Sequence, residues 1–114
     1  MADRLNPNDQ LQRGASLHSQ NNYWRFSMQD DGNLVLYSQS GKPHWASGTN
    51  GKAAAGCIMQ ADGNLVIYGF ERNALWASNT NNNANAYLVV QNDGNVVIYS
   101  SGDNRPLWAT NTNQ

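Results

Sequence analysis

Three segments of nine residues align without gaps and repeat at a fixed interval, and this repeat constrains the fold more than any other feature. The segments are QDDGNLVLY from Gln29, QADGNLVIY from Gln60 and QNDGNVVIY from Gln91, so the interval is 60 − 29 = 31 and 91 − 60 = 31 residues. A Trp-Ala-Ser/Thr sequence follows each segment, beginning at Trp45, Trp76 and Trp108. A period of this length indicates one supersecondary unit that is used three times.

Each unit has the pattern of an antiparallel hairpin. An Asp-Gly pair separates two strand-like runs, and such a pair is a strong signal for a tight turn. In the strand that follows the first turn, alternation places Leu34 and Leu36 on one face and Asn33, Val35 and Tyr37 on the other. The aliphatic face therefore predicts the core. Because no long segment has helical periodicity, we expect an all-β fold with roughly four short strands per repeat.

The length of the chain limits it to one domain. A chain of 114 residues has about the commonest domain size, so we predict a single domain over residues 1–114. Its repeats lie near 29–59, 60–90 and 91–114. The last repeat is shorter than a full period, and we expect residues 1–28 to supply the strand that it lacks. This closure predicts a pseudo-three-fold prism with the three Trp residues near its centre.

Composition and charge exclude several kinds of partner. Asp, Glu, Lys and Arg make up 13% of the residues and the formal net charge is −1, so the chain lacks the basic field that binds nucleic acid. No apolar run has the length of a membrane span, and we expect no membrane insertion. Abundant Asn, Gln, Ser and Thr side chains suit neutral polyhydroxylated ligands better than ions.

The only cysteine, Cys57, has no partner for an internal disulfide or a thiolate metal cluster. Residues 1–10 contain no apolar run of the signal-peptide type. The two features favour a reducing compartment, so we expect a cytoplasmic protein by default, or one exported by a non-classical route. A matured secreted chain would also lack its signal.

The face opposite the core carries the candidate binding residues. Asp accepts hydrogen bonds, Asn and Gln donate and accept them, and a Tyr hydroxyl does either. Such a set satisfies adjacent hydroxyls of a sugar, while Val offers an apolar contact to the C–H face of the ring. The candidate residues are Gln29, Asp31, Asn33, Val35 and Tyr37; Gln60, Asp62, Asn64, Val66 and Tyr68; and Gln91, Asp93, Asn95, Val97 and Tyr99.

The triple QxDxNxVxY motif at this spacing resembles that of the monocot mannose-binding, or bulb-type, lectins, a snowdrop-lectin-like family that has fish and other non-plant members. The resemblance covers the chain from about Leu11 to Asn113, and none of the fifteen motif positions departs from the pattern. It implies the β-prism II fold, which is all-β, with three four-stranded antiparallel sheets in pseudo-three-fold symmetry. It also implies a lectin that recognises D-mannose and mannose-containing glycans, with multivalent binding, agglutination and a role in defence.

The resemblance further implies a role for each motif residue. Asp31 and Asn33 reach the axial 2-hydroxyl of mannose, Gln29 the 3-hydroxyl, Tyr37 the 4-hydroxyl and Val35 the ring carbons, and the same roles carry to the other two repeats. The family also implies a homodimer formed by exchange of a C-terminal strand, although the sequence does not distinguish exchange from self-closure. Plant members have a disulfide cysteine in the first hairpin turn, where this chain has Gly32.

The same residues also allow plainer interpretations. Asp-Gly-Asn is a good turn by itself, but a turn does not require the Gln before it or the Tyr after it. The linkers KPHWASGTNG and RNALWASNTN differ, while the motif face is the same three times. The repeated Trp residues either stack on sugars or fill the core, and the apolar Trp-Ala context favours the core. For Trp24 the sequence does not decide between these two roles. His18 and His44 are expected at the surface.

Enzymatic and metal-binding functions have little support in the pattern. No Ser-His-Asp arrangement is repeated, and each predicted pocket has a single carboxylate, whereas glycoside hydrolysis uses a pair. Asp31-Gly32-Asn33 lacks the later bidentate Glu of a calcium loop. We therefore expect a non-enzymatic protein without metal or cofactor. The competing hypothesis is a structural or protein-interaction prism with incidental pockets; three intact motifs favour the lectin.

Overall fold

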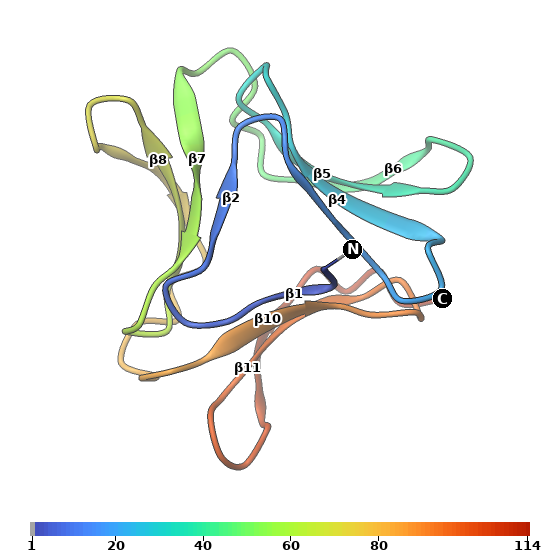
Figure 1. The fold of residues 1–114 in the computed structure, drawn as a ribbon, viewed down its shortest axis with the longest axis vertical. Helices are drawn as coiled ribbons and strands as arrows, with labels where there is room; N and C mark the ends of the chain where they lie inside the picture. The colour runs from blue at the N-terminus through green and yellow to red at the C-terminus, as the bar shows by residue number, and fades with distance from the viewer. Residues whose placement is uncertain (1) are drawn as a thin grey trace.

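The computed structural model describes residues 2–114 as twelve β-strands in three four-stranded antiparallel sheets, arranged around a common axis (Figure 1). This arrangement confirms the predicted all-β prism. Within the described residues there is no helix that is both long and apolar enough to span a membrane.

Each sheet contains one QxDxNxVxY hairpin and the Trp strand that follows it. The first sheet has the order β3-β4-β5-β6, the second β2-β7-β8-β9 and the third β1-β10-β11-β12. The strands of the first sheet are β3 (Ser16–His18), β4 (Trp24–Met28), β5 (Leu34–Ser38) and β6 (Pro43–Ala46). Those of the second are β2 (Gln10–Gln12), β7 (Ala54–Met59), β8 (Leu65–Gly69) and β9 (Ala74–Ala77). Those of the third are β1 (Arg4–Leu5), β10 (Tyr87–Val90), β11 (Val96–Tyr99) and β12 (Pro106–Ala109).

The N-terminal segment passes the three sheets in turn and adds an edge strand to each (Figure 1). As expected, it completes the third sheet, where Leu5 of β1 pairs with Leu88 of β10. It also completes the second sheet, where Leu11 of β2 pairs with Cys57 of β7. The repeat did not predict this second contribution. The third N-terminal strand is β3 in the first sheet. Each of the three strands buries one leucine, which is Leu5 in β1, Leu11 in β2 and Leu17 in β3.

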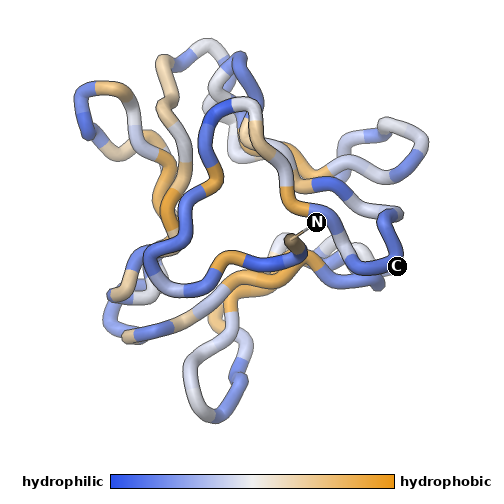
Figure 2. Tube along the Cα trace, in the orientation of Figure 1, coloured by the Kyte–Doolittle hydropathy of each residue, from blue (hydrophilic) through white to orange (hydrophobic). Residues whose placement is uncertain are grey.

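The core lies between the inner faces of the three sheets. The largest fully buried side chains come from the two central strands of each sheet: Phe26, Met28, Leu34, Leu36, Met59, Leu65, Ile67, Leu88, Val90, Val96 and Ile98. Figure 2 shows the hydrophobic stretches in the strands around the axis, whereas the links between strands are mostly hydrophilic. The period-2 alternation of each motif strand therefore separates a buried inner face from an outer face that carries the motif residues.

The three repeated tryptophans close the centre of the prism. Trp45, Trp76 and Trp108 are partly buried against the core, and their ring centroids are 5.5–5.6 Å apart in edge-on pairs. Edge-to-face pairs of this kind contribute roughly 0.5–1.5 kcal/mol each beyond the burial of area. The core-filling interpretation is confirmed. Trp24 is also buried, and its Nε1 donates to the backbone oxygen of Asn92 at 3.2 Å.

Candidate functional site

Each motif begins at the turn that joins the two central strands of its sheet, and the turn is closed by the motif itself. In the first sheet, the backbone nitrogen of Gln29 donates to the Asn33 oxygen at 2.9 Å, and Asp31 Oδ1 accepts from the Asn33 nitrogen at 2.9 Å. The corresponding Asp–Asn bond is 2.9 Å in both other sheets. Gly32 has a φ of +94°, and a Cβ there would lie 2.2 Å from the Lys52 carbonyl oxygen. Only glycine fits this turn.

A second element holds the turn from the side, and we call it the Ser/Thr clamp. It consists of the Ser/Thr-x-Thr segments that follow the Trp strands, which are 47–49, 78–80 and 110–112. In the first sheet, the Thr49 hydroxyl donates to the Gly32 oxygen at 2.6 Å, and Ser47 Oγ accepts from the Leu34 nitrogen at 3.0 Å. The same two bonds recur in the other sheets at 2.5–2.6 Å and 3.0 Å.

The clamp also decides which atom of the motif Asn is available. Asn33 Oδ1 accepts from the Ser47 hydroxyl at 3.1 Å and from the backbone nitrogens of Gly48 and Thr49 at 3.0 and 3.2 Å. Asn64 and Asn95 are held in the same manner, by two bonds each. The carbonyl oxygen is therefore occupied, and the amide nitrogen Nδ2 is left as a donor at the surface. The sequence predicted an Asn that both donates and accepts.

The motif Gln lies between the Asp and the Tyr. Its amide contacts the Tyr hydroxyl in all three sheets. In the first sheet, one orientation of the Gln29 amide forms hydrogen bonds to both Asp31 and Tyr37. In this orientation Nε2 lies 3.1 and 3.3 Å from the two carboxylate oxygens of Asp31, and the amide oxygen accepts from the Tyr37 hydroxyl. The polar groups are thus positioned by one another before any ligand arrives.

All fifteen predicted residues lie in three clusters, five residues in each sheet. In every cluster the Asp is exposed, the Gln, Asn and Tyr are half-buried, and the Val is 3% exposed. Val35, Val66 and Val97 therefore form the floors of the sites, beneath a row of polar atoms. We refer to the clusters as the first, second and third sites. Each combines an anionic acceptor, an amide donor and a hydroxyl, and this set suits a neutral ligand with several adjacent hydroxyls.

The strands that flank the sites differ in chemistry. Opposite the motif Tyr stand Arg25 in the first sheet, Gly56 in the second and Tyr87 in the third. The guanidinium carbon of Arg25 lies 4.7 Å from the centre of the Tyr37 ring. The rings of Tyr87 and Tyr99 are 5.8 Å apart. The three sites thus have the same five residues but different surroundings.

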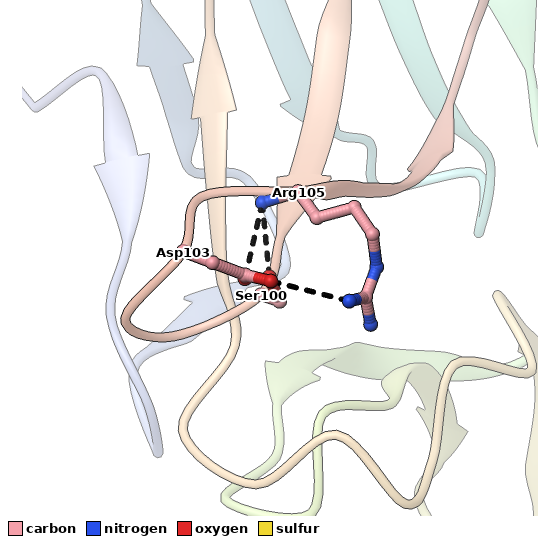
Figure 3. A network of polar contacts seen from close by, with 3 residues as sticks. All are labelled: Ser100, Asp103 and Arg105. Atoms are coloured by element: carbon pink, nitrogen blue, oxygen red, sulfur yellow. Dashed lines mark hydrogen bonds and ion pairs between the residues drawn. The ribbon is translucent and has the colours of Figure 1, made fainter.

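The hairpin tips beyond the sites also differ. In the β11–β12 tip, the backbone nitrogen of Arg105 donates to Ser100 Oγ at 2.9 Å, and its guanidinium lies 3.2 Å from the Asp103 carboxylate (Figure 3). The Ser100 hydroxyl donates to the same carboxylate, and this hydrogen bond is the main cause that lowers the pKa of Asp103. This tip is polar and internally bonded, whereas the β8–β9 tip exposes Phe70.

The histidines and the cysteine lie outside the three clusters and pack within the fold. His44 packs edge-on against the Trp24 ring at 5.0 Å, and His18 is half-buried in β3. Cys57 points into the core from β7, and burial raises the pKa of its thiol to about 12. Within residues 2–114, no group of three or more His, Cys, Asp or Glu residues has a metal-binding arrangement.

Solved structures of several lectins are similar to this fold. A monocot mannose-binding lectin from Gastrodia elata, described as monomeric, has a TM-score of 0.87 and 50% identity, covering 99% of this chain and 100% of that chain. The Marasmius oreades lectin has a TM-score of 0.90 and 35% identity, covering 98% and 92%. The mannose-specific agglutinin of snowdrop (Galanthus nivalis) has a TM-score of 0.77 and 38% identity, covering 98% of each chain.

Sequence comparison gives a shorter match. The B-type lectin plumieribetin of the fish Scorpaena plumieri is 42% identical over 55 residues, which is 48% of this chain and 47% of the fish protein. The matched segment thus spans about half of that relative. No protein-family model matches the sequence.

A three-sheet prism with a shallow polar site on each sheet defines a carbohydrate-binding protein of the β-prism II class, as the likeness to the snowdrop agglutinin shows. The chain belongs to the bulb-type, or monocot mannose-binding, lectin family, since half of its residues are identical to those of the Gastrodia lectin over nearly the whole length. Its lectin relatives identify it as a non-enzymatic, carbohydrate-binding lectin.

Proposed function

We propose that the protein, as a single lectin domain, binds D-mannose and mannose-containing glycans through the three QxDxNxVxY sites. One observation carries the proposal: the same five side chains form the same arrangement on all three sheets, each with an exposed carboxylate beside a free amide nitrogen. The snowdrop relative supports the choice of sugar, because its structure contains methyl-α-D-mannoside.

The chemistry of the first site suits the axial 2-hydroxyl of mannose. A hydroxyl both donates and accepts, so it can donate to the Asp31 carboxylate and accept from Asn33 Nδ2 at the same time. A hydrogen bond to a charged acceptor is about twice as strong as a neutral one. Gln29 and Tyr37 then serve the 3- and 4-hydroxyls, and the buried Val35 supports the ring from below.

Multivalency follows from the geometry of the prism. A shallow site for one sugar typically binds in the millimolar range, which corresponds to about 4 kcal/mol. Simultaneous use of several sites increases the affinity by roughly a hundredfold to ten-thousandfold. The three sites lie on different sheets around one axis, so they engage separate glycan branches. We propose that this cross-linking agglutinates mannose-bearing surfaces and serves defence.

We further propose a homodimer, which would present 2 × 3 = six sites. The relatives differ in this respect: the Gastrodia lectin is described as monomeric and a Mycobacterium smegmatis lectin as a domain-swapped dimer. In the present chain β12 pairs with β11 of the same chain. Analytical ultracentrifugation decides the question, because a mass of one chain, 12.6 kDa, at micromolar concentration would contradict the dimer.

The decisive experiment is a calorimetric titration with methyl α-mannoside, and with methyl α-galactoside as the control sugar. The test variant changes Asp31, Asp62 and Asp93 to Asn, which retains an acceptor for the turn but removes the charge. Asp103→Asn is the matched control, because Asp103 is an exposed carboxylate outside the sites. We expect mannose-selective heat in the wild type and the control, and none in the triple variant. A folded wild type that gives no heat even with mannose oligomers would favour the interaction-scaffold hypothesis.

A further inference from the structure

The second site has an apolar extension that the other two lack, and Phe70 is its main component. Phe70 is 61% exposed, the largest exposed fraction among the bulky hydrophobic side chains of residues 2–114. It lies in the β8–β9 tip, two residues after Tyr68 of the motif. The equivalent residues in the other repeats are Gln39 and Ser101. The hairpin therefore does not need an aromatic residue at this position.

Phe70 and the motif line the same groove. The groove has a volume of about 630 Å³, and its lining includes Gln60 and Tyr68 of the motif together with Ala55, Ile58 and Phe70. This volume is within the usual range of small-molecule sites, roughly 300–1,000 Å³. Gln10 and Arg72 also line the groove, so the polar atoms of Gln60 and Tyr68 continue into a wall that is mostly, but not wholly, apolar.

The guanidinium group of Arg13 lies over the Phe70 ring. The guanidinium carbon of Arg13, which follows β2, lies 5.4 Å from the centre of the ring. A guanidinium over an aromatic face is attracted by the ring quadrupole. Arg13 therefore lies over one face of the ring, and the large exposed fraction of Phe70 leaves the rest of the ring accessible to a ligand.

The flanks of the first and third sites carry other groups. The other exposed bulky aromatic residue, Tyr23, lines a groove with Asp93 of the third site, but its ring packs edge-on against Trp24, with centroids 5.1 Å apart. The groove of the first site is lined by Arg25, Asp30 and the hydroxyls of Ser16 and Ser27. At the third site, the Tyr87 hydroxyl donates to Asn104 at 2.6 Å and its ring lies against Tyr99. A largely exposed phenyl ring two residues after the motif Tyr is a property of the second site alone among these three.

We propose that the second site is a two-sugar site, in which mannose occupies the motif and a second hexose places its C–H face on Phe70. The negative face of an aromatic ring attracts weakly positive C–H groups. The inference rests on the proposed function. Carbon 5 of mannose, which bears C6, is bonded to C4, and Phe70 lines the same groove as Tyr68. With the 4-hydroxyl on Tyr68, we therefore assign the link to the second hexose to the 6-hydroxyl.

A single-site parent isolates the effect. In this parent, Asp31→Asn and Asp93→Asn disable the first and third sites and leave the second intact. The probes are methyl α-mannoside and its α1,6-linked mannobioside. We expect the disaccharide to bind about three- to tenfold more tightly than the monosaccharide, and Phe70→Ala to abolish this ratio without changing monosaccharide affinity. Phe70→Tyr should retain the ratio, and Gln39→Ala, the equivalent position in the first repeat, is the matched control.

Each outcome separates the two hypotheses. A ratio that is unchanged by Phe70→Ala, or equal affinities in the parent, overturns the two-sugar site but not the binding of mannose. A folded parent that binds neither probe, beside a wild type that also binds neither, overturns the proposed function and this inference with it. Phe70 is 61% exposed and does not belong to the hydrophobic core, so the melting temperature of Phe70→Ala should stay close to that of its parent and any lost binding reflects the ligand.

Discussion

The turns beneath the three sites are nearly identical in geometry, while the strands and tips beside them are not. The Asp–Asn turn bond is 2.9 Å in every sheet, and the bond from the clamp Thr to the turn Gly is 2.5–2.6 Å. By contrast, the residues opposite the motif Tyr are Arg25, Gly56 and Tyr87. The turns and the flanking strands belong to the same sheets, but the turn bonds are the same in each sheet, whereas the flanking strands differ in their residues from one sheet to the next.

This contrast indicates where recognition can vary in this fold. The turn and the Ser/Thr clamp position the atoms that face a ligand, so a substitution there disturbs stability and binding together. The flanking side chains contact a ligand only beyond the primary sugar. They can differ from sheet to sheet while the three primary sites keep one geometry.

The largest expected effect comes from a turn glycine. Gly63→Ala would place a Cβ 2.3 Å from the Asn83 oxygen and 2.8 Å from the Thr80 oxygen, at a φ of +95°. We expect a loss of about 3 kcal/mol or more in the free energy of unfolding, measured by urea denaturation. Gly41→Ala is the control, because Gly41 has a φ of +88° with open space around it; it should cost about 1–2 kcal/mol. Equal losses would show that the close approach is unimportant.

The motif Asn has two roles that substitution separates. Asn33→Ala removes the acceptor for three donors of the clamp, and we expect a destabilisation of about 1–3 kcal/mol with loss of binding at the first site. Asn33→Asp keeps the acceptor but removes the Nδ2 donor. It should retain most of the stability and still lose the site, which is measured as a fall in calorimetric stoichiometry from three to two. Full stoichiometry in Asn33→Asp would contradict the assigned donor.

A flanking residue should have a smaller effect that is confined to one site. Arg25 stacks on Tyr37, and its guanidinium donates to Ser27 Oγ at 3.1 Å. We expect Arg25→Ala to change the free energy of unfolding by less than about 1 kcal/mol. It should weaken the first site about two- to fivefold, because the Tyr37 ring is less restrained. Titration of single-site parents measures this change in affinity, and an equal change at the second site would show that the effect of Arg25 is not confined to its own sheet.

The smallest effect is expected at the β11–β12 tip. The hydrogen bond from Ser100 lowers the pKa of Asp103, so this carboxylate stabilises the folded chain above its ordinary unfolded pKa. That stabilisation is lost as the pH falls through the lower folded value. Because Asp103 is exposed, solvent screens the effect. Asp103→Asn should lower the melting temperature slightly at pH 7, and this deficit should shrink as the pH is lowered below the ordinary pKa of the carboxyl group. A deficit that stays constant as the pH is lowered would exclude the ionised carboxylate as its cause.

The repeated motif predicted the central hairpins and the site residues because a nine-residue pattern with alternating burial contains both. It did not predict that every sheet receives an N-terminal strand. Strands of two or three residues are too short for alternation to be recognised, and the remaining signal is one leucine every six residues, at Leu5, Leu11 and Leu17. Their surroundings are polar, so only the folded sheets show what each leucine covers.

The Ser/Thr clamp was recognised as a repeated sequence but not as a support for the site. Its bonds join residues that are 13–18 positions apart, such as Ser47 with Asn33 and Thr49 with Gly32. Local propensity contains no information about such pairs. The same limit applies to Phe70, whose position beside Tyr68 becomes clear only when the hairpin and the groove are seen together.

The way the N-terminal segment is distributed among the sheets has a consequence for synthesis on the ribosome. The first sheet is complete once residue 46 has emerged, whereas Arg4 must wait for Val89, which is 89 − 4 = 85 positions later. Until then, β1 has no partner strand in its own chain, and its backbone groups are open to pairing with other chains. The sheets therefore finish in the order in which their Trp strands emerge, and β1 is among the last strands to be paired although it precedes all the others.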